Sequence, residues 1–259
     1  MSNELRPVLI GEGVYLLSDY GTANAYIVIG EKSCAVIDSG SGVCELRELA
    51  RELSEGKEVI LLLTHAHTDH MGGARQFERA YIHPLERSRL WQGSEWFKRI
   101  FLWQCRKNGR LLSSAPPPTR ARADSHSLNF LSEAQEFDLG GRRISWFLSP
   151  GHTEGSVCYV DSQSKILFSG DAANPIMLIG KNKSANLSLA KASLKKISEL
   201  CEEYKIYCGH CERPLSQTAV RALIELCEGL ERGGGNFAKT QIDTGSEKQR
   251  LRVVLSRRL

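Results

Sequence analysis

The stretch that decides the fold of this 259-residue chain is Thr64-His65-Ala66-His67-Thr68-Asp69-His70. It holds three imidazoles and one carboxylate and directly follows the apolar run 59–63, which suits a strand that is covered on both faces. In an extended loop, His65 and His67 project to the same side and can share one cation, while a following turn directs Asp69 and His70 toward a second. Imidazole and carboxylate ligands suit zinc, iron or manganese, and the lack of thiolates argues against a closed structural zinc site.

Three later segments place single His or Asp side chains directly after apparent strands. They are Leu148-Ser149-Pro150-Gly151-His152, Leu167-Phe168-Ser169-Gly170-Asp171 and Ile206-Tyr207-Cys208-Gly209-His210. The glycine in each segment permits a turn, and we expect the strand ends to gather these groups on one edge of the sheets. Together with the first motif they supply seven ligands, which suffice for two metal ions.

Apolar patterning along the rest of the chain predicts a layered α/β architecture. Glycine separates three short strands of an antiparallel meander, and a helix then leads to the buried strand at 59–63. The second half has a similar order of strands, helix and strand, without a residue-level repeat. The further strands are expected at 14–17, 26–29, 34–38, 144–148, 157–160, 166–168 and 205–207, and the helices at 44–53, 187–200 and 215–230.

The motifs resemble those of the metallo-β-lactamase superfamily, with H-x-H-x-D-H followed in order by His, Asp and His over roughly residues 14–215. The resemblance implies a four-layer αβ/βα sandwich of two mixed β-sheets with outer helices and a dinuclear metal centre at one edge. It implies two divalent ions, with zinc favoured and iron or manganese as alternatives. By the family pattern His65, His67 and His152 hold the first ion, Asp69, His70 and His210 hold the second, and Asp171 bridges them.

Two divalent ions close together imply a hydrolytic mechanism. A water that bridges them loses a proton near neutral pH, so a bridging hydroxide would act as the nucleophile, and Asp69 would orient it or pass a proton to the leaving group. Because true β-lactamases carry cysteine or serine where this chain has Asp171, the chain looks more like the glyoxalase II and lactonase branches. The sequence therefore predicts a metal-dependent hydrolase that cleaves an ester, thioester or lactone.

Three alternatives to this prediction remain open. The first is a phosphodiesterase or nuclease of the same fold, although the long basic arm and additional motifs of such nucleases are not identified here. The second is an iron-dependent redox enzyme that uses the same ligands, and the third is a non-catalytic protein that keeps the metals. Nucleic acid is accordingly disfavoured as a partner, and a small molecule is favoured.

Composition limits the setting in which the chain works. It is 41% hydrophobic and 25% charged, which is typical of a soluble globular protein. No run approaches the ~20 apolar residues of a membrane span, and residues 1–20 lack the pattern of a secretory signal. We therefore expect a cytoplasmic protein without a membrane partner. The eight cysteines show no regular framework, so we expect buried thiols, including Cys208 and Cys211 around His210, rather than structural disulfides.

Residues 84–130 form a cationic and aromatic segment with nine basic residues, three acidic residues and three of the four tryptophans. A predicted helix at 94–106 places Trp96, Ile100 and Trp103 on one stripe, with Arg99 largely elsewhere. We expect these aromatics to wall the metal cleft or a homodimer interface, and the positive charge to attract an anionic substrate. A helical hairpin that merely packs on the core is the alternative. The candidate substrate contacts are His83, Trp96, Arg99 and Trp103.

We expect one metallo-β-lactamase-like domain over residues 1–235, with residues 84–130 as an insertion. The three prolines at 116–118 must form a stiff, extended loop, and the three glycines at 233–235 mark a flexible joint. The remaining residues, 236–259, are predicted to form a basic C-terminal strand or tail, in which 250–255 could be a final edge strand.

Overall fold

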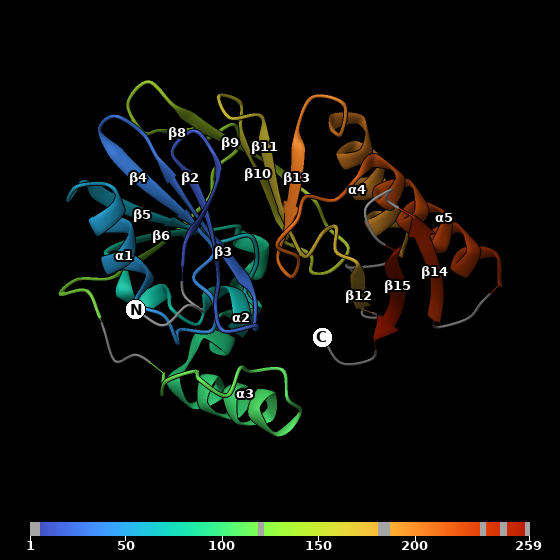
Figure 1. Ribbon diagram of the computed structural model, residues 1–259, viewed down its shortest axis with the longest axis horizontal. Coiled ribbons are helices and arrows are strands. Elements are labelled where there is room, and N and C mark those ends of the chain that lie inside the picture. Colours follow the sequence, from blue (N-terminus) through green and yellow to red (C-terminus); the bar gives the residue numbers. More distant parts are fainter. Residues whose placement is uncertain (1–5, 119–121, 181–186, 234–236, 244–247, 257–259) are drawn as a thin grey trace. The chain divides into compact units, whose positions relative to one another are not determined.

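The computed structural model describes residues 6–118, 122–180, 187–233, 237–243 and 248–256 of the chain (Figure 1). The chain divides into two compact units. The first unit comprises Met1–Ser145 and Asp161–Ser164, and the second comprises Trp146–Val160 and Lys165–Leu259. The structure contains sheets with both parallel and antiparallel strand pairs, and helices lie between strands along the chain. This arrangement confirms the predicted α/β class. The expected domain boundaries stay a prediction.

The first unit is built on a seven-stranded sheet in which the strands follow one another in chain order. The first four strands pair antiparallel, and each pair from β4 to β7 is parallel. Parallel neighbours need crossover connections, which the helical segments after β4, β5 and β6 supply. The strands are β1 (Val8–Gly11), β2 (Val14–Ser18), β3 (Asn24–Ile29), β4 (Ser33–Ile37), β5 (Glu58–Leu62), β6 (Arg79–Ile82) and β7 (Ser127–Phe130).

The parallel register of the first unit decides where its polar side chains meet. Ile37 pairs with Leu62, and Leu62 pairs with Tyr81, so β4, β5 and β6 end at the same edge of the sheet. The core of this unit includes Leu61 and Phe77, both fully buried. Its helical segments are α1 (Leu46–Leu53), α2 (Thr68–Met71), η2 (Ala74–Gln76), η3 (Pro84–Gly93) and α3 (Glu95–Lys107).

A five-stranded sheet has the order β13-β11-β10-β9-β8, and the division between the two units falls within β9. Its strands are β8 (Phe137–Asp138), β9 (Arg143–Leu148), β10 (Val157–Asp161), β11 (Ile166–Gly170) and β13 (Lys205–Cys208). In the second unit β11 and β13 are parallel, and their register shifts between Phe168 and Gly170. The ends of these two strands therefore lie side by side, directly before the predicted ligands Asp171 and His210.

The second unit also contains a three-stranded sheet of order β12-β15-β14, which the sequence did not predict. Its strands are β12 (Ile176–Gly180), β14 (Phe237–Asp243) and β15 (Lys248–Ser256). The helices α4 (Leu187–Leu200) and α5 (Gln217–Gly233) pack against each other (Figure 1). Their core side chains include Leu194 and Leu223, which are fully buried together with Val253 of β15.

The C-terminal segment differs from the expected edge strand or tail. β15 is the central strand of its sheet, because it pairs in parallel with β12 and antiparallel with β14. Of the expected flexible joint, Gly233 ends α5, and Gly234 and Gly235 lie outside the described residues. Among the helices in the described ranges, none is long and apolar enough to cross a membrane.

Candidate metal centre

The loop between β5 and α2 brings three histidines of the first unit together. His65 Nε2 lies 3.0 Å from His67 Nδ1, and the ring centroids of His65 and His70 are 4.1 Å apart. The side chains of His65 and His70 are fully buried, while His67 is half-buried. Asp69 stands in the first turn of α2 and is also half-buried. Three neighbouring imidazoles in a buried loop would repel one another if they were protonated, so a cation among neutral rings suits this arrangement.

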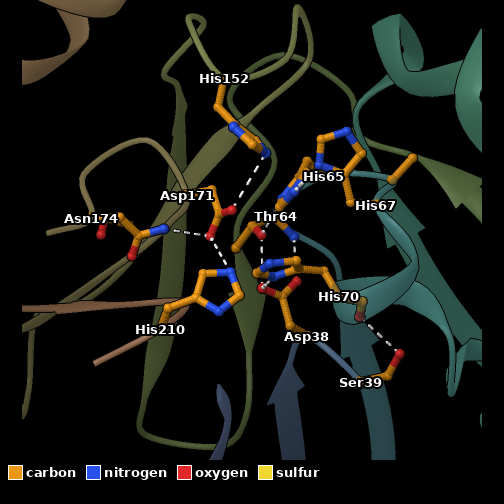
Figure 2. Close-up of polar contacts among 12 residues, drawn as sticks. Asp38, Ser39, Thr64, His65, His67, His70, His152, Asp171, Asn174 and His210 are labelled. Carbon is orange, nitrogen blue, oxygen red and sulfur yellow. Dashed lines mark hydrogen bonds and ion pairs between the residues drawn. The ribbon is translucent and has the colours of Figure 1, made fainter. Parts of the chain in front are cut away.

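A buried carboxylate that the sequence analysis missed holds this loop in place. Asp38 directly follows β4, and its Oδ1 accepts a hydrogen bond from the backbone N–H of Thr64 at 2.8 Å. Its Oδ2 accepts from the hydroxyl of Thr64 at 2.7 Å and lies 2.7 Å from Nδ1 of His70 (Figure 2). The signal that could have found Asp38 is its place at the end of a strand next to the strand that precedes the histidine motif.

The contact with Asp38 selects the tautomer of His70. A carboxylate can only accept hydrogen bonds, so Nδ1 of His70 carries the proton and Nε2 is the nitrogen that can bind a metal. Such carboxylate–histidine pairs fix the orientation of a ligand ring and make it more basic. The chain therefore presents His70 in the form that a metal site needs.

Glu86 in η3 supports the same loop from the other side. Its side chain is fully buried, and its Oε2 accepts a hydrogen bond at 2.8 Å from the backbone N–H of Ala66, the residue between His65 and His67. The neighbouring candidate His83 begins this helical segment, where its Nδ1 accepts a hydrogen bond from the N–H of Leu85 at 3.3 Å. Burial lowers the pKa of His83, which favours a neutral ring.

Changing Glu86 to alanine is expected to destabilise the metal-free protein and to weaken metal binding. Loss of the carboxylate leaves the buried N–H of Ala66 without this acceptor, which costs about 1–3 kcal/mol in the free energy of unfolding. A loosened ligand loop should also lower metal affinity by about 10- to 100-fold, as is typical for partners of metal ligands. Urea unfolding and chelator competition measure the two effects. The Glu86→Gln variant keeps an acceptor oxygen and should retain most of both properties, whereas equal losses in the two variants would contradict this role.

The second unit brings together the other three predicted ligands. Asp171 lies in the turn after β11, and its Oδ2 is 3.4 Å from Nε2 of His152 while its Oδ1 is 3.3 Å from Nε2 of His210 (Figure 2). The amide nitrogen of Asn174 donates a hydrogen bond to Oδ1 of Asp171 at 2.7 Å. Each carboxylate oxygen of Asp171 thus faces a different imidazole, which suits a carboxylate that binds two ions at once.

His152 is held in a defined orientation by its backbone surroundings. Its Nδ1 lies 2.7 Å from the carbonyl oxygen of Leu178, and it donates there when Nε2 is the ligand nitrogen. The preceding Gly151 has a φ of 147°, and a Cβ atom at this position would lie 2.5 Å from Cα of Ala190 in α4. Glycine is therefore required for the turn that presents His152.

The donor set fits a divalent metal. All seven predicted ligands are His or Asp side chains, four of them in the first unit and three in the second. Nitrogen and carboxylate oxygen donors without thiolate match zinc, iron or manganese. Cys208 and Cys211 flank His210, but a hydrogen bond with Cys211 and burial raise the pKa of the Cys208 thiol well above its usual range. In the metal-free protein this shift favours the protonated form of the Cys208 thiol.

The aromatic face expected on the helix of the 84–130 segment differs in detail from the structure. α3 packs through Leu102 and Cys105, whereas Trp96 and Trp103 are exposed. Arg99 is exposed as well, and its spacing of three and four residues from the two tryptophans puts it on their face of the helix. The expectation that this arginine lies largely elsewhere was wrong.

Residues 19–210 match the family model described as the metallo-beta-lactamase superfamily. The match covers well over half of the chain and includes every predicted ligand. The chain therefore belongs to this superfamily, as its motifs indicated, and it is an enzyme of the metal-dependent hydrolase class.

Relatives of the chain include several named hydrolases. It is 28% identical over 225 residues to the human (Homo sapiens) acyl-coenzyme A thioesterase MBLAC2. The aligned residues cover 78% of this chain and 79% of the relative. It is 27% identical over 148 residues to the hydroxyacylglutathione hydrolase GloC of Haemophilus influenzae, covering 54% and 61% of the two chains. Among solved structures, the metallo-beta-lactamase family protein TTHA1429 of Thermus thermophilus is similar in fold, with a TM-score of 0.56, 23% identity and coverage of 85% and 80%.

Proposed function

We propose that the chain is a dinuclear metal-dependent hydrolase that cleaves thioesters, with zinc as its metal. The observation that carries the proposal is Asp171, whose two oxygens face the imidazoles of His152 and His210 separately. A carboxylate with one oxygen toward each of two histidines is suited to bridge a pair of cations. Two relatives support a thioester among the predicted ester, thioester and lactone, because acyl-coenzyme A and hydroxyacylglutathione, which appear in their names, are both thioesters.

In this proposal the ligand sets of the two units together bind two ions. When bound, the ions would acidify a water molecule and polarise the acyl carbonyl of the substrate. The side chains of the protein would hold the ions, orient the water molecule and transfer its proton. The first ion is assigned to His65, His67 and His152, the second to Asp69, His70 and His210, and Asp171 is assigned to both.

Several side chains of the centre then have separate tasks. Asp38 keeps the proton of His70 on Nδ1, so that Nε2 stays available as a ligand. Asp69 holds a carboxylate at the start of α2, where it can orient the attacking water and pass its proton to the sulfur of the departing thiol. The products of the reaction are a carboxylate and a thiol. No side chain needs to form a covalent bond with the acyl group.

The test compares substrates on protein that has been stripped with a chelator and reloaded with zinc or manganese. We expect kcat/KM for a thioester to exceed that for the matching oxygen ester and for a phosphodiester. The Asp69→Asn variant, measured in parallel, should lose activity by about a hundredfold or more, which ties turnover to this centre. Preferred cleavage of the phosphodiester would favour the nuclease alternative. Iron in the purified protein together with oxygen consumption would favour the redox alternative.

A further inference from the structure

The outer face of α3 exposes aromatic and cationic side chains. Trp96 is 71% exposed and Trp103 is 61% exposed. Arg99 lies between them in the sequence, is exposed, and makes no ion pair with any residue of the described ranges. Burying an exposed tryptophan against a ligand is favourable, and a guanidinium group without a partner can still bind an anion. The face therefore has the chemistry of a binding surface.

A cavity of about 550 Å³ lies on this face, lined by Glu95, Trp96, Arg99 and Arg122. This volume lies within the range of small-molecule sites. Glu95 is engaged by Lys98, whose Nζ lies 3.0 Å from its Oε1, and by Arg122 at 3.7 Å. The acidic residue of the cavity is thus already neutralised by two cations. The cavity consequently offers an indole ring and net positive charge to a ligand.

The helix that bears the cavity is held rigidly. The hydroxyl of Ser94 accepts a hydrogen bond from the N–H of Phe97 at the first turn, at 3.3 Å. Near the other end, Nη2 of Arg106 donates to the carbonyl oxygens of Ala115 and Pro116 at 3.1 and 3.3 Å, which ties the proline loop to the helix. These contacts hold the backbone of the helix before any ligand arrives, so the ordering cost of binding falls on the exposed side chains.

We propose that this cavity, the α3 pocket, binds the phosphorylated adenine nucleotide of a coenzyme A thioester, a proposal that rests on the proposed thioesterase function. Trp96 offers a flat ring for stacking against adenine. Arg99 offers a guanidinium fork that matches phosphate oxygens, and Arg122 adds a second positive charge beside Glu95. The surrounding segment 84–130 carries nine basic against three acidic residues, a surplus of six positive charges that complements the phosphates.

The place of α3 in the first unit agrees with this role. The helix packs next to α2, which carries Asp69 and His70, and Nζ of Lys98 lies 3.5 Å from the carbonyl oxygen of Gly72 just after α2. In a coenzyme A thioester, a long pantetheine chain separates the nucleotide from the acyl sulfur. The nucleotide would therefore bind some distance from the reacting carbonyl, and α3 lies on the unit that carries four of the predicted ligands.

The experiment measures binding of adenosine 3′,5′-bisphosphate by calorimetry, together with hydrolysis of one acyl group carried by coenzyme A or by N-acetylcysteamine. The Trp96→Ala and Arg99→Gln variants should each raise the Kd of the bisphosphate and the KM of the coenzyme A thioester about tenfold, equivalent to about 1.4 kcal/mol. Their kcat/KM for the N-acetylcysteamine thioester, which lacks the nucleotide, should stay unchanged. Lys107→Gln removes one positive charge from the same helix outside the pocket lining and serves as the matched control.

Each outcome decides the proposal. Absence of bisphosphate binding to the intact protein, or equal Kd values in all three variants, would overturn it. Binding to anionic phospholipid vesicles that the Trp96 and Arg99 variants lose, with unchanged bisphosphate binding, would assign the face to a membrane surface and overturn it as well. Pocket-dependent bisphosphate binding without hydrolysis of any thioester would support the α3 pocket and reject the proposed function alone.

Discussion

Replacing Asp171 by alanine is expected to lower metal content and activity together, with kcat/KM reduced at least about a hundredfold. Substitution of residues that merely support a metal ligand typically costs 10- to 100-fold in affinity or activity, so loss of a shared ligand should cost at least as much. The physical reason is that each oxygen of Asp171 faces a separate imidazole, so its removal affects both proposed ions. Elemental analysis of the purified variant gives the stoichiometry, and initial rates on a thioester give kcat/KM.

Two control variants test whether the effect is specific to the carboxylate of Asp171. Asp124→Asn removes an exposed carboxylate from the first unit and should leave metal content and kcat/KM for an N-acetylcysteamine thioester unchanged. Asn174→Ala removes the donor to Oδ1 of Asp171 and should have a smaller effect than loss of the carboxylate itself. Two tightly bound ions and full activity in the Asp171→Ala variant would reject the bridging assignment.

The sequence could predict which His and Asp side chains come together within each unit because they lie in short motifs directly after strands. His65, His67 and His70 are within six residues of one another, and their neighbourhood follows from local geometry. Asp38 and Glu86 are different, since their contacts with Thr64, His70 and Ala66 depend on which strands and turns become neighbours. The place of Asp38 at a strand end is a signal, but it does not identify the partners of this residue, and nothing in the local pattern of Glu86 indicates its contact. Such supporting contacts can be predicted only when the order and register of the strands are known.

Two other features needed contacts between distant parts of the chain. β15 is central because it pairs with β14 and also with β12, whose Ile176 lies 76 residues before its partner Arg252, so its apolar residues could not reveal whether it lies at an edge. A lysine in a helix is usually exposed to solvent. Lys98 is instead buried, and its Nζ contacts Glu95 and the carbonyl oxygen of Gly72. Lys98 is buried together with Leu102 and Cys105, whereas Trp96 and Arg99 are exposed. Helical spacing places Arg99 on the face of the two tryptophans, but it could not predict that this face is the exposed one.

The Asp38→Asn substitution is expected to remove metal binding at His70 while leaving the fold intact. The backbone N–H of Thr64 cannot rotate away, so the amide oxygen of the new side chain should keep this donor, as Oδ1 of Asp38 does at 2.8 Å. The amide NH₂ then faces Nδ1 of His70 and donates to it, which forces the ring proton onto Nε2. A protonated Nε2 cannot bind a metal. We expect the metal stoichiometry to fall from two to one and kcat/KM to fall about a hundredfold or more.

Asp38→Ala separates this tautomer effect from a loss of stability. Asp38 has a φ of 60°, a conformation that Asn tolerates well and Ala poorly. Alanine also leaves Thr64 without its acceptor, so the metal-free Asp38→Ala protein should unfold at a lower urea concentration than Asp38→Asn. Because alanine does not donate to His70, its Nε2 remains able to bind a metal. The alanine variant should therefore be the less stable of the two and the asparagine variant the weaker in metal affinity, as measured by urea unfolding and chelator competition. If Asp38→Asn bound two ions as tightly as the unmodified protein, Nε2 of His70 would not be a ligand, because its proton and a metal cannot share one lone pair.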